Sequence, residues 1–317
     1  MTFEEAKGLL KLSREARWSY PSSQGGDMVR QDTELSRWTD RLVPKRESFT
    51  TAIEVLVRNG FEDEAVETAA NMWRLWMIAR DMAGGRKFLD TVLGVTKKKL
   101  SRSRALALYG NGLFMFHQRK LEESQKYNQE ALEIAEKIND REALALANLG
   151  LSRVAYEQGN YVEARSLAAK ALELTRGLDP SLGQAPLFMD ALSTRMLADY
   201  DTAADLFSKS VELNRKIGDK GMVTAELQNL GLVEAHQGNY ESAEKHFKEA
   251  ETMGSGGDAY GAAMVQLQKA IVAYGRRDQD QSRQLLASSK TLLEKAGIDP
   301  GPDDKFEIEW LEQQLRR

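Results

Sequence analysis

The stretch LGLVEAHQGNYESAEKHFKEA, from Leu230 to Ala250, contains the corner that decides the fold. Gly238 and Asn239 interrupt two segments that are rich in helix-forming residues. Glycine readily adopts the left-handed conformation that ends a helix. An asparagine side chain can accept a hydrogen bond from the free N–H groups at the start of the next helix. The stretch therefore predicts two helices joined by a sharp turn, with Asn239 as the cap of the second.

The residues on either side of this corner have the sizes that a close helix pair requires. Gly231 and Ala243 are small, which lets two helices cross closely at that point. Tyr240 and Phe247 are two helical turns apart, and we expect both to face the neighbouring pair. All four are interpreted as packing residues rather than catalytic ones.

The same pattern recurs along the chain with a period of 39 or 40 residues. A small residue follows five positions after each of six aligned corners, which are Arg80, Arg119, Gly159, Ala198, Gly238 and Arg277. One helix pair cannot bury its apolar face alone, but stacked pairs can. The repeat predicts an all-α fold, a right-handed superhelix (α-solenoid) of about six helix pairs. N-terminal helices are expected before it and a C-terminal capping helix after it.

The boundaries of the expected domains follow from the repeat. Residues 1–60 are predicted to be an N-terminal helical segment with a linker at about 19–30, where SYPSSQGGD gathers Pro, Ser and Gly. Residues 61–296 are the repeat superhelix, and residues 297–317 are the capping helix. The capping helix is expected to separate apolar from polar residues: Phe306, Ile308, Trp310 and Leu311 against Glu307, Glu309, Glu312 and Gln313.

Composition argues against several classes of function. A net charge of −4 and a pI near 5.7 lack the basic footprint of a nucleic-acid-binding protein. No apolar run reaches the length of about 18 residues that a membrane span needs. The chain has no cysteine, which excludes disulfides and cysteine nucleophiles and is compatible with a reducing cytoplasm. We expect a cytoplasmic protein with no nucleic-acid and no membrane partner.

No motif in the sequence points to catalysis or to a cofactor. The three histidines, His117, His236 and His246, lack the i, i+4 spacing of a helical zinc site. No Ser-His-Asp arrangement and no cofactor fingerprint can be singled out. We therefore expect a protein that is not an enzyme and that holds neither a metal nor a cofactor.

The corner and the small crossing residues resemble the tetratricopeptide repeat (TPR), whose usual period is 34 residues. The longer period found here is similar to the sensor half of bacterial transcription regulators of the maltose-activator and antibiotic-regulator group. The resemblance continues upstream, over Glu34 to Leu93. The matching residues there are Trp38, Leu42, Gly60, Ala65, Trp73, Trp76, Gly85, Arg86 and Leu89.

Two parts that those regulators usually carry are missing from this sequence. It has no GxxxxGK[ST] phosphate-binding loop and no basic recognition helix. The resemblance therefore implies an effector-responsive architecture, and it does not transfer NTPase activity or DNA binding to this chain.

The first helix of each pair lines the concave side of a tetratricopeptide superhelix, and its side chains there are the candidates for ligand binding. Read at fixed offsets before each corner, these positions are aromatic or amide-bearing, with a few arginines. The predicted groove residues are Arg74, Tyr109, Phe116, His117, Arg153, Tyr156, Phe188, Arg195, Gln228, Asn229, His236, Gln268 and Tyr274. Leu113, Leu149, Leu192, Leu232, Leu267 and Ile271 share these offsets and equally fit plain helix–helix contacts.

Two hypotheses of function remain open at the level of sequence. The first is a non-enzymatic module whose groove binds a peptide or a protein partner, with a small-molecule effector as a variant of the same idea. It would act as an adaptor or as an effector-responsive regulator. The second is an assembly scaffold whose groove is filled by its own N-terminal helix, in residues 1–30, or by a second copy in a homo-oligomer.

Overall fold

The computed structural model describes residues 1–16, 40–97, 99–254 and 257–316, and within these ranges all regular structure is helical, without any strand. The predicted all-α fold is thus confirmed. The expected linker at residues 19–30 and Trp38 lie outside the described residues. The helices form two compact units, and the division between them passes through α9 (Arg141–Glu157) and α10 (Tyr161–Leu174).

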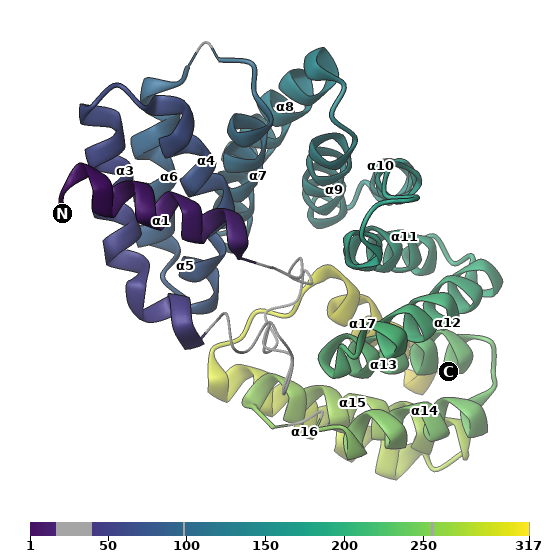
Figure 1. The fold of residues 1–317 in the computed structure, drawn as a ribbon. Helices are drawn as coiled ribbons and strands as arrows, with labels where there is room; N and C mark the ends of the chain where they lie inside the picture. Colours follow the sequence, from purple (N-terminus) through teal and green to yellow (C-terminus); the bar gives the residue numbers. More distant parts are fainter. Residues whose placement is uncertain (17–39, 98, 255–256, 317) are drawn as a thin grey trace. The chain divides into compact units, whose positions relative to one another are not determined.

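The first unit contains residues 1–155 and 166–186 (Figure 1). Trp76 stacks on Phe88 with ring centroids 4.0 Å apart, and both rings are almost fully buried. The two Trp residues at positions 73 and 76 therefore belong to the core. Besides most of α9, the elements are α1 (Phe3–Glu15), η1 (Val43–Lys45), α3 (Arg46–Arg58), α4 (Glu62–Met72), α5 (Arg74–Ile78), α6 (Met82–Val95), α7 (Arg102–His117), α8 (Leu121–Ile138), the end of α10 and η2 (Pro180–Gly183).

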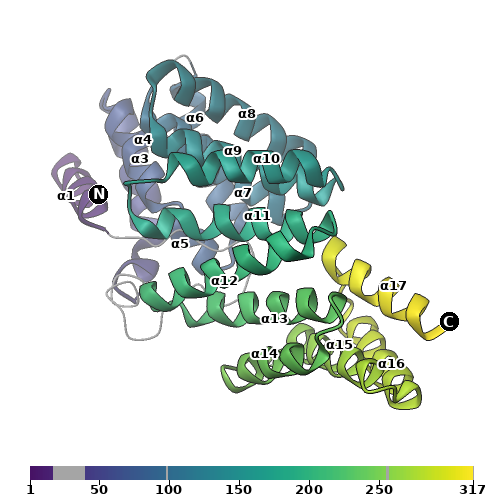
Figure 2. The ribbon, with the colours of Figure 1, turned by 90° about the vertical axis from the view of Figure 1, so that its right-hand side faces the viewer.

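The second unit contains residues 156–165 and 187–317. Figure 2 shows α12 to α16 stacked in the order of the chain, each helix beside the one before it. Consecutive helices in this stack pack along their lengths, as expected for helix pairs. The elements are α11 (Gln184–Met196), α12 (Tyr200–Ile217), α13 (Lys220–His236), α14 (Tyr240–Thr252), α15 (Ala259–Gly275), α16 (Gln279–Ala296) and α17 (Pro302–Arg316).

Every corner of the repeat places a residue in the left-handed region of the backbone. The φ angle is 82° at Gly238 and 79° at Gly159, so the predicted role of Gly238 is confirmed. The other four corners reach φ of 56° to 64° without glycine, at Arg80, Arg119, Ala198 and Arg277. A side chain in this region costs about 1 kcal/mol or more. The surrounding helix pair therefore imposes the same turn on residues that do not favour it.

The prediction that Asn239 caps the following helix through its side chain is wrong. Asn239 stands at the N-cap position of α14, but its side chain makes no capping hydrogen bond. At three equivalent corners, Asp81, Asp199 and Asp278 do accept from the backbone N–H three residues later. An ionised carboxylate is attracted by the positive end of the helix dipole, and the neutral amide lacks that attraction.

The small residues of the opening stretch lie where the helices cross, as predicted. A Cβ atom placed on Gly231 would lie 2.5 Å from Cε1 of Phe247, so α13 and α14 approach too closely there for any side chain. Ala243 is completely buried. A Cβ atom on Gly275 would lie 2.1 Å from Cγ of Tyr240, which shows that Tyr240 faces α15 of the next pair. The close fit of the two helices thus holds the pair together. Gly231, Tyr240, Ala243 and Phe247 all serve this packing.

Candidate functional site

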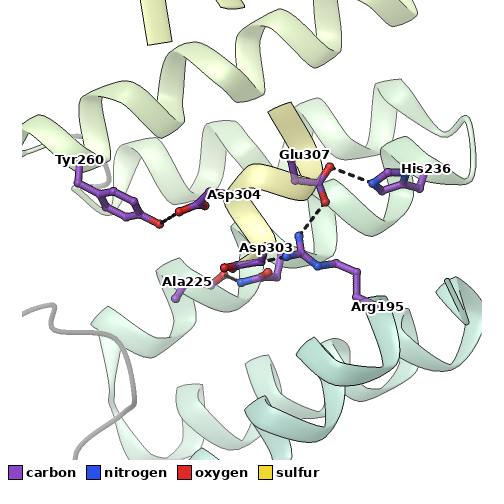
Figure 3. Close-up of polar contacts among 8 residues, drawn as sticks. Arg195, Ala225, His236, Tyr260, Asp303, Asp304 and Glu307 are labelled. Atoms are coloured by element: carbon purple, nitrogen blue, oxygen red, sulfur yellow. Dashed lines mark hydrogen bonds and ion pairs between the residues drawn. The ribbon is translucent and has the colours of Figure 1, made fainter. Parts of the chain in front are cut away.

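The first helices of the pairs in the second unit are α11, α13 and α15, and we call the surface that they form together the first-helix face. The C-terminal helix α17 lies on this face. Glu307 of α17 accepts a hydrogen bond from Nη1 of Arg195 on α11 at 3.1 Å. Its other oxygen lies 2.9 Å from Nε2 of His236 on α13. Figure 3 shows Glu307 between these two side chains.

Glu307 was expected on the polar, solvated side of a capping helix, and the structure corrects this. The side chains of Glu307, Arg195 and His236 are only 2%, 1% and 3% exposed. Asp303, one helical turn earlier, adds a second carboxylate 3.5 Å from Nη2 of Arg195. Removing one partner of a buried ion pair typically costs about 3–5 kcal/mol because the other charge is left unpaired. The buried carboxylate therefore fixes α17 in register on the first-helix face.

Aromatic rings surround this ion pair. The Trp310 ring of α17 lies 4.5 Å from the His236 ring and 6.2 Å from that of Tyr274 on α15. On its other side the His236 ring stacks on Tyr200 at 4.7 Å, with 4° between the planes. Phe306 completes the enclosure at 5.5 Å from His236. The rings exclude water from the carboxylate and so strengthen its interactions with Arg195 and His236.

A second polar contact joins α17 to α15. The hydroxyl of Tyr260 donates to Oδ2 of Asp304 at 3.0 Å (Figure 3). Burial and the neighbouring carboxylate of Asp303 raise the pKa of Asp304 to about 7. Burial and the charges of Asp304 and Asp303 also raise the pKa of Tyr260. Asp304 is therefore a group whose ionisation depends on whether α17 is in place.

The first unit holds another buried arginine among the predicted groove residues. Arg153 on α9 is 1% exposed and donates from Nη1 to the hydroxyl of Tyr109 on α7 at 3.0 Å. Its Nε and Nη2 atoms are buried and have no hydrogen-bond partner among the described residues. Burial and the charge of Arg153 lower the pKa of His117 to about 4, so this imidazole is neutral at pH 7. A guanidinium with unused donors is suited to bind a carboxylate.

The remaining predicted groove residues fall into two groups. Arg74 lies over the Trp73 ring at 4.5 Å, and Phe188 packs against Phe207 of α12, so both contact aromatic rings of the protein. The others lie on the first helices and are buried or half-buried. They are Phe116 beside His117, Tyr156 beside Tyr161, Gln228, Gln268, and Asn229, which donates to the carbonyl of Ala225 within its helix.

Arg195, His236 and Tyr274 are among the predicted groove residues, but the residues that contact them were not predicted. Asp303, Glu307 and Trp310 stand at i, i+4 and i+7, which places them on one helical face. This spacing was visible in the sequence. It pointed to no particular partner, because the helices it meets are up to 112 residues away along the chain.

The N-terminal helix α1 packs on α3 and α4 of its own unit. The Phe3 ring lies 4.8 Å from that of Phe61, and Arg14 forms a bidentate ion pair with Glu67. In the described part of the chain, the helix that covers predicted groove residues in the second unit is α17. Under the scaffold hypothesis, the expected occupants were the N-terminal helix or a second copy of the chain.

The described residues contain no group of three or more His, Asp or Glu side chains placed to hold a metal ion. None of their helices is both long and apolar enough to cross a membrane.

Comparison with known proteins identifies the repeats. The tetratricopeptide-repeat family matches residues 103–177 and, in a second form, residues 227–250. The chain therefore contains tetratricopeptide repeats. No curated protein sequence matches it.

Several solved structures are similar in fold. A Rap protein complexed with Competence and Sporulation Factor is 15% identical, with a TM-score of 0.59 over 92% of this chain and 77% of that one. NprR in complex with its cognate peptide NprX is 18% identical, with a TM-score of 0.57 over 98% and 82%.

A third similar structure is a signal transduction ATPase with numerous domains from Pyrococcus horikoshii, which carries a tetratricopeptide repeat sensor. It is 18% identical, with a TM-score of 0.57 over 83% of this chain, which spans 45% of that protein. At these identities the three likenesses establish the fold, a helical solenoid of the tetratricopeptide type.

Proposed function

We propose that this protein is a non-enzymatic binding module that captures a peptide or protein segment on the first helices of its repeats. The observation that carries the proposal is Glu307, a carboxylate on a helix, held between Arg195 and His236. The chain thereby supplies an example of the kind of segment that this surface accepts. We place the protein in the cytoplasm, as an adaptor or an effector-responsive regulator.

The buried arginine of the first unit supports the same chemistry. Arg153 uses one N–H donor on Tyr109 and keeps Nε and Nη2 without a partner among the described residues. Burying a charge is costly unless it is paired. A carboxylate supplied by a bound segment would satisfy both donors and remove this cost. Arg153 and Tyr109 are therefore the proposed ligand anchor of the first unit.

The comparisons favour a regulatory role by analogy of fold. NprR was solved with a peptide, and the archaeal ATPase carries its repeats as a sensor. The long-repeat sensor halves of maltose-activator and antibiotic-regulator type proteins suggest the same arrangement. Fold alone does not determine function, and the contacts of Glu307 and the buried arginines support the binding role of this chain.

The assembly scaffold is a second candidate, favoured by the observation that the chain covers part of its own first-helix face. In that case α17 would be a permanent part of the fold, and the unit would offer other surfaces to a second copy. A repeat protein of this kind would retain no partner through Arg153. This difference allows the two functions to be separated.

The test is a capture experiment from the cytosol of the source organism with three baits. They are the wild type, Arg153→Met and a matched control, Lys170→Met, which removes an exposed cation from α10. Methionine approximates the volume of arginine, and replacing a buried charge in this way is often neutral for stability. Mass spectrometry would identify the retained proteins, the peptides and the released small molecules.

We expect a partner that the wild type and Lys170→Met retain equally and that Arg153→Met retains at least about tenfold less. Loss of a hydrogen-bonded charge contact of about 1.5–3 kcal/mol gives this factor. A retained small molecule with the same dependence would identify a small-molecule effector. Identical lists from all three baits would contradict the proposal and favour the scaffold.

A further inference from the structure

The helix α17 follows the last repeat and is not part of any helix pair. The last pair, α15 and α16, is complete at Gly297, which has a φ of 64° and ends α16. A non-helical segment of residues 297–301 then leads to α17. Because the pairs of the second unit are formed without it, α17 can leave its place without breaking any helix of the stack.

Two kinds of contact hold α17. Ile308, Leu311 and Leu315 join an apolar core that includes residues of α13 to α16. Asp303, Asp304 and Glu307 make polar contacts with the first-helix face. Only the first of these two contacts resembles the capping of a repeat array by an amphipathic helix.

The polar contact places carboxyl groups of α17 against hydrogen-bonding groups of the repeats. On α17 the groups are the carboxylates of Asp303, Asp304 and Glu307. Facing them from the repeats are the guanidinium of Arg195, the imidazole of His236 and the hydroxyl of Tyr260. A cap that only shields apolar surface from water would not need three acidic residues aimed at these groups. These polar contacts therefore exceed what capping alone requires.

We propose that the first-helix face of the second unit is a docking surface for an acidic amphipathic helix of a partner protein, and that α17 occupies it while the partner is absent. This inference rests on the proposed binding function. The partner helix presents two carboxylates at i and i+4, for Arg195 and His236, and an aromatic ring at i+7. Its apolar residues would replace those of α17 on the last pair. Binding of the partner then releases α17.

The direct test uses the α17 sequence itself as the probe, as a synthetic peptide of residues 299–316 with an N-terminal fluorescein. The proteins are full-length chains: the wild type and an opened variant with Glu307→Arg and Trp310→Ala. The arginine at position 307 would lie against Arg195 and repel its own helix. Fluorescence anisotropy measures how strongly each chain binds the peptide.

We expect the opened variant to bind the peptide at least about tenfold more tightly than the wild type does. In the wild type the tethered α17 competes at an effective concentration that is in the millimolar range for short linkers. Adding Arg195→Met to the opened variant should reduce the binding at least about tenfold. A peptide with glutamine in place of Glu307 should lose as much, because only the charge is removed.

A second measurement covers the case in which the opened variant does not fold, as judged by its circular dichroism. Hydrogen exchange of the wild type is recorded with and without excess unlabelled peptide. We expect the amides of residues 302–316 of the protein to exchange faster with the peptide present, while those of α12 and α13 stay unchanged. The protein is uniformly labelled with ¹⁵N, so its fragments differ in mass from those of the peptide, which has the same sequence.

Three results would overturn the inference. One is a folded opened variant that does not bind the peptide, and another is binding that does not depend on Arg195. The third is a concentration-dependent dimer of the wild type with protected α17 amides, which would assign the face to a second copy of the chain. If Arg153-dependent capture persisted in any of these cases, the proposed binding function would still be supported. Only the proposed displacement of α17 by a partner helix would be refuted.

Discussion

A methyl group at Gly231 would compete with the Phe247 ring for the same space, since its position lies 2.5 Å from Cε1 of that ring. Gly231→Ala is therefore expected to destabilise the chain by about 1–3 kcal/mol, the usual effect of overpacking a core. The loss should occur although alanine favours a helix more than glycine does. Urea unfolding followed by circular dichroism measures it.

Gly8 provides the matched control for this substitution. It lies in the exposed part of α1, and a Cβ atom there would meet nothing within 4 Å. Gly8→Ala should stabilise α1 by about 0.5–1 kcal/mol through helix propensity alone. A similar change at both positions would show that the close crossing of α13 and α14 is not what determines the choice of glycine at 231.

The corner of the opening stretch allows a second prediction. Asn239 makes no side-chain cap, whereas Asp278 at the equivalent place accepts from the N–H of Gln281 at 3.0 Å. Asn239→Asp is expected to raise the free energy of unfolding by about 0.5 kcal/mol, and Asp278→Ala to lower it by about 1 kcal/mol. Thermal melts at low ionic strength would measure both. An unchanged melting temperature for Asp278→Ala would refute the capping account.

At the scale of single residues the sequence was informative because the causes are local. Gly238 forms the turn between two helices that are adjacent in the sequence, and Gly231 meets Phe247 across the same corner. The missing cap of Asn239 could not be foreseen. Asn and Asp are about equally favoured at this position, and which of them forms the bond depends on the final geometry of the helix start.

At the scale of elements, α17 has a pH dependence that follows from Asp304. Docking raises the pKa of this carboxyl to about 7, while a free aspartate titrates near 3.9. At a pH between these two pKa values, the docked helix therefore binds more protons than the free helix does. The stabilisation due to this proton is complete below about pH 4 and is lost as the pH rises through about 7. Docking of α17 should weaken by about tenfold from pH 6 to pH 8.

Amide exchange of residues 302–316, corrected for the intrinsic pH dependence of exchange, measures this weakening. The groups that face Asp304 are Asp303 on its own helix, Tyr260 on α15 and Arg195 on α11. Asp304→Asn should abolish the tenfold change. His236→Gln serves as a control, because His236 contacts Glu307 rather than Asp304. A pH dependence that survives in Asp304→Asn and disappears in His236→Gln would assign it to the histidine.

At the scale of the whole molecule, a repeat array is expected to respond locally. Each pair contacts mainly its neighbours, so a defect spreads little beyond them. In Gly231→Ala we expect faster hydrogen exchange in α13, α14 and the adjoining α12 and α15. The amides of α3, α4 and α7 should keep their wild-type rates. Exchange that accelerates equally throughout the chain would show a single cooperative unit instead.

The sequence by itself determined the helical repeat, its period, the left-handed turn at Gly238 and the small residues at the crossings. These features follow from contacts between residues that are close along the chain, which recur with every unit and therefore leave a periodic signal. The same signal placed Arg153, Arg195 and His236 on the first helices of their pairs.

Only the tertiary structure decided what lies against those side chains. Glu307 meets Arg195 across 112 residues and His236 across 71, in contacts made once and not repeated. A single long-range contact has no period, and three acidic residues on an amphipathic helix also suit a solvated surface. The burial of Glu307 depends on where the repeats end and on the side to which the last segment turns, and neither is recorded in any local pattern.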